Sequence, residues 1–324
     1  MDFRTELSLK PAPWKININD PILTLGSCFA QSMGMKFLQN KFQATVNPFG
    51  TTYHPVSIHK LLNYVVFQET PSQHTYLENE GVFYNYDFHS KISAPTLQSV
   101  QKQINESIGS LHYIIKNCKI LMLTYGTSWI YDRVDTGDSV ANCHKLSAAL
   151  FSKRLVAIDE IRNSFRHTYR QLKSVQPSLR VILTVSPVRH LKDTLTLNTV
   201  SKSMLRIACH QISQEHSDVD YFPAYEIMVD DLRDYRFYKD DLIHPTEAAE
   251  KYIWDKFRST YFDTSTLSFL KQWNDILNAL THRPTYPESK VHQKFLRETL
   301  ALLEELKSTA NVDDELNLVR HQLK

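Results

Sequence analysis

Glycine is the residue that this sequence most clearly lacks. Only seven of the 324 residues are glycine, about a third of the ~7% average for soluble proteins. A chain that avoids glycine keeps it where any other residue would be strained, chiefly at positive φ or where two backbones approach closely. Three of the seven, Gly26, Gly50 and Gly126, directly follow short strand-like runs. We therefore expect tight turns at strand ends at these positions.

Further absences exclude several classes of protein. The four cysteines, scattered with no C-x-x-C pair, give neither a disulfide framework nor a standard zinc pattern. No apolar run approaches the roughly 18 residues that a membrane span requires. The N-terminal segment contains acidic residues and lacks the apolar segment of a secretory signal. Lys+Arg 37 against Asp+Glu 35 leaves a formal charge of +2, without the basic excess of a nucleic-acid binder. We expect a soluble cytoplasmic protein with no membrane or nucleic-acid partner.

Short apolar runs alternate with amphipathic segments through the first 260 residues. This alternation predicts a parallel sheet covered by helices on both faces, with chemistry gathered at the carboxyl ends of the strands. The expected strands are residues 21–25, 42–46, 118–126, 181–185 and 219–225. The expected helices are residues 28–38, 56–67, 147–173 and 200–214 and a last one beginning at Pro245, with a hairpin at 129–143.

Two segments fall outside this alternation. Residues 68–95 are polar and aromatic and are expected to form an insertion or lid, whose aromatic side chains either pack it down or line a substrate groove. Residues 261–324 carry two apolar stripes at helical spacing. We expect an α/β domain over residues 1–260 and a helical extension over 261–324 that caps the domain or forms the surface of a homo-oligomer.

Two short motifs combine the residue types of nucleophilic catalysis. Ser27 follows Gly26 at the end of the first expected strand, and Asp241 precedes His244 by three residues near the end of the α/β part. A serine hydroxyl needs a base, and an imidazole needs a partner that fixes its tautomer. The spacing of Asp241 and His244 lets one loop supply both base and orienting carboxylate, with Asp240 as a rival to Asp241.

The residues around these motifs resemble the GSCFA family, a branch of the SGNH/GDSL-type hydrolases. The resemblance covers about residues 15–258 in the expected order. Its six motifs are GSCFA at 26–30, NPFGT at 47–51, YGTSW at 125–129, VANCHK at 140–145, SPVRH at 186–190 and DLIHP at 241–245.

The resemblance implies a three-layer α/β/α sandwich with a five-stranded parallel sheet, of the SGNH-hydrolase or flavodoxin-like type. It implies that Ser27 is the nucleophile, His244 the general base and Asp241 its orienting acid. The backbone N–H groups of Ser27 and Gly50 would form the oxyanion hole.

Two positions depart from the parent superfamily. That superfamily usually has an Asp between the glycine and the nucleophile, whereas Gly26 adjoins Ser27 directly. It also supplies an Asn side chain as a further oxyanion donor, at the position that Ser128 holds here. The donor would then be Ser128, or else Thr127, Asn47 or Asn142.

Several other residues near the motifs are interpreted as contacts or as packing. Thr127, Asn142 and His144 are candidate substrate-binding residues, and so are Arg189 and His190, which follow the fourth strand and could bind a carboxylate or sugar. For Cys28, burial as a structural cysteine is favoured over a role as thiol nucleophile.

The leading functional hypothesis is a serine-dependent acyl-ester hydrolase that acts through an acyl-enzyme and needs no cofactor. Its substrate would be an O-acetylated carbohydrate or another small ester. Two alternatives use the same pocket: acyl transfer to an alcohol other than water, and ligand binding without turnover. A metal site built from His54, His144 and His244 fits no standard zinc spacing, so no metal is expected.

Overall fold

The computed structural model describes residues 4–324. The chain divides into two compact units: unit 1 comprises the chain up to Ser8 with residues 21–35 and 44–254, and unit 2 comprises residues 9–20, 36–43 and 255–324. The sequence-based division at residue 260 differs from this one, because two short N-terminal segments belong with the C-terminal helices. Among residues 4–324, no helix has both the length and the apolar character needed to cross a membrane.

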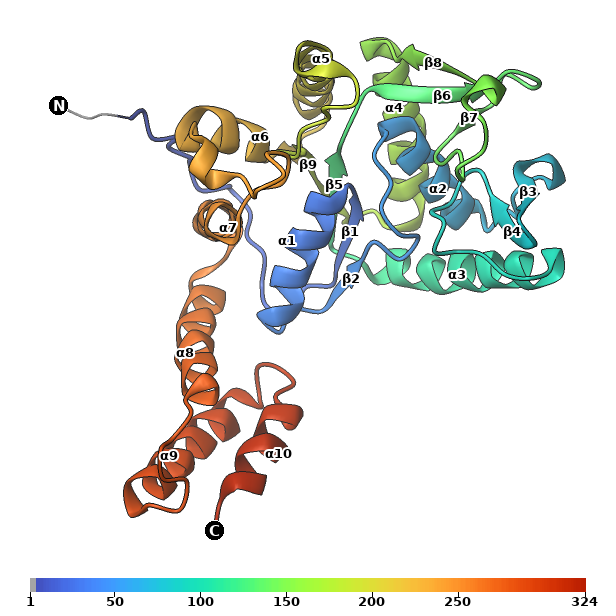
Figure 1. Cartoon of the computed structure of the whole chain (residues 1–324). Helices are drawn as coiled ribbons and strands as arrows, with labels where there is room; N and C mark the ends of the chain where they lie inside the picture. The colour runs from blue at the N-terminus through green and yellow to red at the C-terminus, as the bar shows by residue number, and fades with distance from the viewer. Residues whose placement is uncertain (1–3) are drawn as a thin grey trace. The chain divides into compact units, whose positions relative to one another are not determined.

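Unit 1 is built on a five-stranded parallel sheet (Figure 1). Its strands lie in the order β10-β9-β5-β1-β2, and every neighbouring pair is parallel. Their bounds are β1 Ile22–Gly26, β2 Ala44–Val46, β5 Ile120–Tyr125, β9 Arg180–Val185 and β10 Val219–Tyr221. The expected parallel sheet is confirmed. All five carboxyl ends therefore lie at one edge, the edge at which α/β proteins bind ligands.

Helices cover both faces of this sheet. Leu23 and Leu25 of β1 belong to the large apolar core that also includes side chains of α2 Pro55–Phe67, α3 Leu97–Asn117, α4 Ile158–Val175 and α5 Thr194–Glu215. Thr24 points to the opposite face, where α1 Cys28–Gln39 lies so close that a Cβ on Gly34 would be 2.8 Å from the Thr24 hydroxyl. The structure confirms the layered α/β arrangement.

Two stretches differ from the expected elements. The expected helix at 147–173 is instead a 3₁₀ turn (Ala148–Leu150), strand β8 (Phe151–Leu155) and α4. β8 pairs with β6 (Trp129–Arg133), which also pairs with β7 (Ser139–Val140), so the expected hairpin gains a third strand. Helix α3 has five buried apolar side chains at helical spacing, yet it was not predicted.

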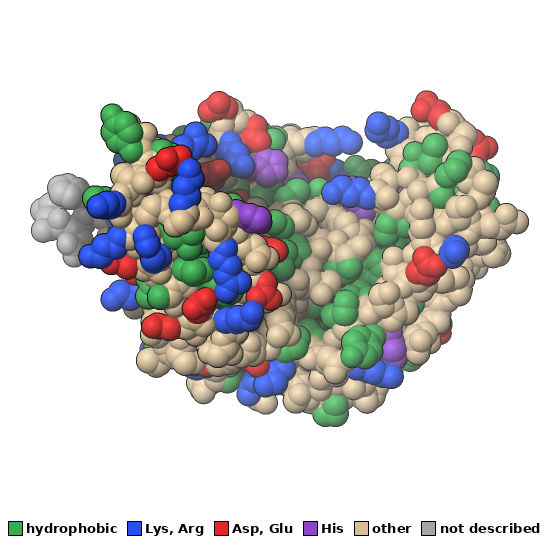
Figure 2. Space-filling view, turned by 90° about the horizontal axis from the view of Figure 1, so that it is seen from below, with side chains coloured by type: hydrophobic (Ala, Val, Ile, Leu, Met, Phe, Trp, Pro, Cys, Tyr) green, Lys and Arg blue, Asp and Glu red, His purple; other side chains and the backbone are tan. Residues whose placement is uncertain are grey.

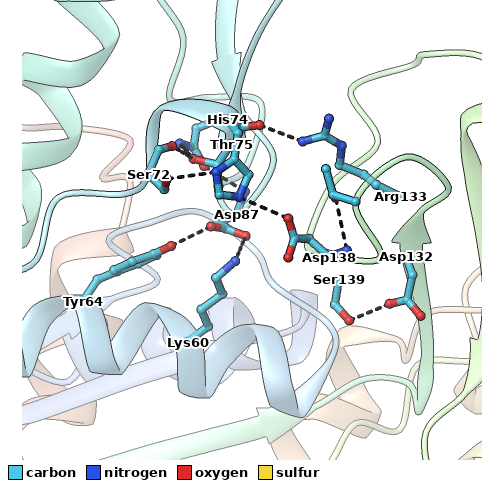
Figure 3. Close-up of polar contacts among 12 residues, drawn as sticks. Lys60, Tyr64, Ser72, His74, Thr75, Asp87, Asp132, Arg133, Asp138 and Ser139 are labelled. Atoms are coloured by element: carbon cyan, nitrogen blue, oxygen red, sulfur yellow. Dashed lines mark hydrogen bonds and ion pairs between the residues drawn. The ribbon is translucent and has the colours of Figure 1, made fainter.

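The polar and aromatic segment at 68–95 is tied to its neighbours. It forms the hairpin of β3 (Tyr76–Asn79) and β4 (Val82–Asn85). The Asp87 carboxylate accepts hydrogen bonds from Lys60 Nζ at 2.7 Å and Tyr64 Oη at 2.8 Å, both from α2 (Figure 3). Arg133 of β6 donates to the His74 carbonyl oxygen at 2.6 Å.

The aromatic side chains of this segment support the packing interpretation. Tyr86 and Phe88 are buried, and Phe83 and Tyr84 are half-buried. Phe88 packs edge-on against Phe49. The hairpin is therefore held against α2 and β6 at several points.

Unit 2 contains the C-terminal helices α8 Thr264–Thr281, α9 Lys290–Leu306 and α10 Asp313–Gln322. The apolar stripe of α8 is buried, as the spacing predicts. Trp273 on α8 donates to the Gln39 carbonyl oxygen at 2.8 Å, and Lys41 pairs with Glu315 of α10. These contacts join residues 36–43 to the C-terminal helices. Helix α7, Glu247–Tyr261, has residues in both units.

Because glycine is rare in this sequence, we predicted that Gly26 lies in a tight turn at the end of β1. A substitution at this position tests that prediction. Gly26 has φ +141°, and a Cβ there would lie 2.2 Å from the Thr124 carbonyl oxygen. We expect Gly26→Ala to lower the free energy of unfolding by roughly 2–4 kcal/mol, because a side chain would force β1 and β5 apart. Urea denaturation measures the change.

The matched control is Gly109→Ala in the middle of α3. A Cβ at Gly109 meets nothing within 4 Å, so this variant should be more stable than wild type by about 0.5–1 kcal/mol through helix propensity. Equal effects of the two substitutions would contradict the assigned role of Gly26.

Candidate functional site

The turn after β1 places Ser27 at the carboxyl edge of the sheet. Ser27 caps α1, since its Oγ accepts a hydrogen bond from the Phe29 N–H at 3.3 Å and its carbonyl oxygen accepts one from Ala30. Its backbone N–H donates to the Thr124 carbonyl oxygen at 3.2 Å. The residue is 2% exposed. Ser27 is thus a helix cap at the carboxyl edge of the sheet, and helix capping is compatible with the predicted role.

Asp241 and His244 form a compact pair within one loop. Asp241 Oδ2 lies 2.7 Å from His244 Nδ1, and Oδ1 accepts the backbone N–H groups of Ile243 at 2.8 Å and His244 at 3.0 Å. Hydrogen bonds lower the pKa of Asp241 to about 2. The largest effect comes from the backbone N–H of His244, followed by the His244 ring and the backbone N–H of Ile243. The carboxylate is therefore ionised at neutral pH and can only accept, so it holds the proton of a neutral imidazole on Nδ1. Nε2 is then the nitrogen with a free lone pair.

Arg189 holds this loop in place. Its backbone N–H donates to the Ile243 carbonyl oxygen at 3.3 Å, and its Nη1 donates to that of Leu242 at 3.5 Å. Its guanidinium lies 3.8 Å from the centre of the Tyr238 ring. The structure thus gives Arg189 a role in holding the loop, whereas the sequence predicted a substrate contact.

The two halves of the predicted triad lie at the same edge of the sheet. Ser27 follows β1 and Arg189 follows β9, and both strands pair with β5. With about 4.8 Å between neighbouring strands, the two strand ends are about 10 Å apart. Within residues 4–324, no hydrogen bond joins Ser27 Oγ to His244. The structure forms the Asp241–His244 pair and places Ser27 at the same edge of the sheet as this pair. The serine and the pair are not hydrogen-bonded to each other among the described residues.

The groups predicted for the oxyanion hole have partners within the protein. The Gly50 N–H donates to the Asn47 carbonyl oxygen at 2.8 Å, and the Ser27 N–H is bonded to Thr124. Ser128 is fully buried, and its hydroxyl donates to Ser201 of α5. In this structure the Ser128 hydroxyl is bonded to α5 and offers no free donor, so its role as an oxyanion donor stays a prediction.

Asn47 has a side-chain donor that no other described residue accepts. Its Oδ1 accepts the Gly26 N–H at 2.9 Å, which fixes the orientation of the amide because an N–H can bond only to the oxygen. Its Nδ2 is buried and has no hydrogen-bond partner among the described residues. Asn47 has φ +40°, in the left-handed region that asparagine adopts more readily than most residues with a side chain. A buried donor without a partner calls for an explanation, and a ligand is one.

The remaining substrate-binding candidates hold loops together. Thr127 Oγ1 accepts the Trp129 N–H and contacts Ser201. His144 is buried, with Nε2 2.8 Å from the Asn85 carbonyl oxygen and Nδ1 3.1 Å from Ser90 Oγ.

Asn142 and His190 have similar roles. Asn142 donates to Ser90 and accepts the His144 N–H. His190 Nε2 lies 2.7 Å from the Gly126 carbonyl oxygen, and burial, with a smaller effect of the Lys202 charge, lowers the pKa of His190 to about 4. The neutral ring therefore donates from Nε2 at physiological pH. All these residues lie near the expected edge, but their polar groups are engaged.

Two residues beside the site, Tyr53 and His89, were not predicted from the sequence. Tyr53 accepts the Gly126 N–H through its carbonyl oxygen at 2.7 Å, and its hydroxyl lies 3.4 Å from Cys28 Sγ. His89 lies against Gly50, where a Cβ would be 2.6 Å from the His89 Cβ. The glycines Gly50 and Gly126 were the signal that something approaches closely there. Cys28, expected to be buried, is half-buried, because its thiol points toward Tyr53.

The charges on one face of the molecule are mixed in sign. On the face drawn in Figure 2, Lys and Arg side chains are interspersed with Asp and Glu. Among residues 4–324, no three His, Cys, Asp or Glu side chains are placed to hold one metal ion.

The Asp241–His244 geometry predicts a tautomer that can be measured. We expect neutral His244 to carry its proton on Nδ1 in the wild type and to shift toward the Nε2–H form in Asp241→Asn, because the amide can donate to Nδ1. Imidazole ¹⁵N chemical shifts distinguish the two forms. Asp240→Asn is the matched control and should leave the shifts unchanged. The same shift in both variants, or in neither, would contradict the pairing.

Comparison with known proteins gives the family. A search of curated proteins finds no match. The family model described as "GSCFA family" matches residues 21–257, and the one described as "GSCFA domain protein, C-terminal domain" matches residues 273–324. The first match contains Ser27, Asn47 and the Asp241–His244 pair. The chain belongs to the GSCFA family.

Proposed function

We propose that this chain is a serine-dependent acyl-ester hydrolase of the SGNH/GDSL type. The observation that supports it best is the Asp241–His244 pair, joined at 2.7 Å and held by Arg189 of the segment after β9, at the edge of the sheet where Ser27 follows β1. A carboxylate that orients an imidazole near a serine is the arrangement that activates a hydroxyl.

In the proposed reaction, His244 Nε2 takes the proton of Ser27 Oγ as that oxygen attacks the ester carbonyl carbon. Asp241 stabilises the imidazolium that forms. The tetrahedral intermediate collapses, and the alcohol leaves with the proton from Nε2. Water then attacks the acyl-enzyme with the same base, which releases the acid and restores Ser27. The reaction requires Ser27 Oγ to leave the Phe29 N–H and turn toward His244, a hydrogen bond that free enzymes often form only with substrate present.

We propose Asn47 as an oxyanion donor in this reaction. Its Nδ2 is a buried amide donor without a partner among the described residues, and its Oδ1 holds Gly26 next to the nucleophile. Preorganised donors of this kind lower a barrier by roughly 3–4 kcal/mol. The substrate class that we propose is a small ester, such as an O-acetylated carbohydrate, processed in a reducing compartment that suits four free thiols.

Hydrolysis is tested with Ser27→Ala and His244→Ala on a short-chain nitrophenyl ester. We expect kcat/KM to fall at least about 10³-fold in each variant, because each removes one member of a unit. Cys28→Ala is the matched control, since it removes the neighbouring nucleophile, and it should stay within about threefold of wild type.

Near-wild-type activity in Ser27→Ala would exclude the mechanism, and loss of activity only in Cys28→Ala would assign the thiol instead. Acylated product formed with a sugar acceptor would favour acyl transfer. A ligand-induced rise in Tm without turnover across an ester panel would favour binding alone.

Asn47→Asp separates the two functions of the Asn47 amide. The variant keeps an acceptor for Gly26 and loses the donor, so we expect kcat to fall about 10²–10³-fold with KM little changed. Urea denaturation checks that the variant is folded. An unchanged kcat would exclude Asn47 as an oxyanion donor.

A further inference from the structure

Lys202 is a buried lysine at the ends of two central strands. It lies on α5 and is 1% exposed. Its Nζ donates to the carbonyl oxygens of Gly126 and Ser186, both at 2.7 Å. Burial lowers the pKa of Lys202 to about 7, while two carbonyl acceptors favour the charged form. Within the described residues, no carboxylate bonds to it.

The two carbonyl groups that Lys202 joins belong to neighbouring strands. Gly126 follows β5 and Ser186 follows β9, at the point where each chain leaves the sheet. Beyond this point the sheet no longer supplies partners for these carbonyl groups, and an unpaired buried carbonyl costs about 1–3 kcal/mol. With one ammonium group, Lys202 supplies a partner for Ser186 and, beside His190, a partner for Gly126. Lys202 thereby fixes the distance between the ends of β5 and β9, where the two segments that follow these strands diverge.

The segment that leaves β9 bonds directly to the Asp241–His244 loop. Three residues after Ser186, Arg189 bonds to the carbonyl groups of Leu242 and Ile243. His190, the next residue, bonds to the same Gly126 carbonyl oxygen as Lys202. The position of the loop thus depends on the β9 end, and the β9 end is held by Lys202.

We propose that Lys202 is a positioning residue that sets the place of the Asp241–His244 pair through the β9 end. Burying an ammonium group is costly, and an apolar side chain of similar volume would fill the same space with less penalty. We therefore infer that a lysine occupies this position because its ammonium group donates to two carbonyl oxygens at once. Its consequence for catalysis rests on the proposed hydrolase function, whereas its effect on the loop does not.

The test is hydrogen exchange of the loop in Lys202→Met, which keeps the length of the side chain and removes the donors. We expect the N–H groups of Arg189, Ile243 and His244 to exchange about tenfold faster than in wild type, because loop opening is easier. The matched control is Ile212→Ala, a fully buried position on the same helix. It should lower global stability and leave these three groups within about twofold of wild type.

Equal exchange of the loop in both variants would overturn the proposal, because it would show only a general loss of stability. If Lys202→Met does not fold, Lys202→Gln keeps one amide donor group and should show a smaller acceleration that still exceeds the control. No excess in that variant would also overturn it.

Activity gives the second readout. On the nitrophenyl ester, Lys202→Met should lower kcat about tenfold or more with little change in KM, because the base and not the substrate site is displaced. An unchanged kcat beside fast loop exchange would remove the catalytic consequence. If Ser27→Ala keeps full activity, hydrolysis by this triad fails, and the exchange result still decides the role of Lys202.

Discussion

Main-chain groups that the parallel sheet leaves unpaired at its carboxyl edge are the constraint on which this site depends. Each strand ends in buried surroundings, so the N–H and C=O groups just past it need partners from elsewhere. Asn47 supplies one for Gly26, the Tyr53 carbonyl oxygen supplies one for Gly126, and Lys202 supplies one each for Gly126 and Ser186. The geometry of the site follows from how these groups are satisfied.

Several polar residues of the sequence motifs are also bonded to main chain and are not free to bind a ligand. His144, Ser128 and His190 each bond to main chain that is far away in the sequence. The groups that we propose for the chemistry are the Ser27 hydroxyl, which would first leave the Phe29 N–H, His244 Nε2 and Asn47 Nδ2. Groups held in place at a rigid edge are what a preorganised site needs.

The strands that are buried on both faces could be predicted from the sequence. A short, continuous apolar run such as residues 120–125 is typical of a strand covered on both sides. β8 was missed since Ser152 and Lys153 are exposed and hide its alternation. The Asp241–His244 pair was readable because a local spacing carries it. The contacts of Arg189 and Ser128 could not be predicted from the sequence. Arg189 bonds to main-chain carbonyl groups, which leave no signature in the sequence. Ser128 bonds to Ser201, which lies 73 residues later.

Leu242 has φ +56°, a left-handed conformation that costs a leucine roughly 1–2 kcal/mol. Its residue type does not favour the turn that brings Asp241 and His244 together. The turn is held by the Asp241 carboxylate, which accepts two N–H groups within it, and by Arg189, which packs on Tyr238 and bonds to the carbonyl groups of Leu242 and Ile243. A graft of this tetrapeptide onto another scaffold would keep the first support and lose the second. Transplanting the pair requires the arginine–tyrosine support to move with it.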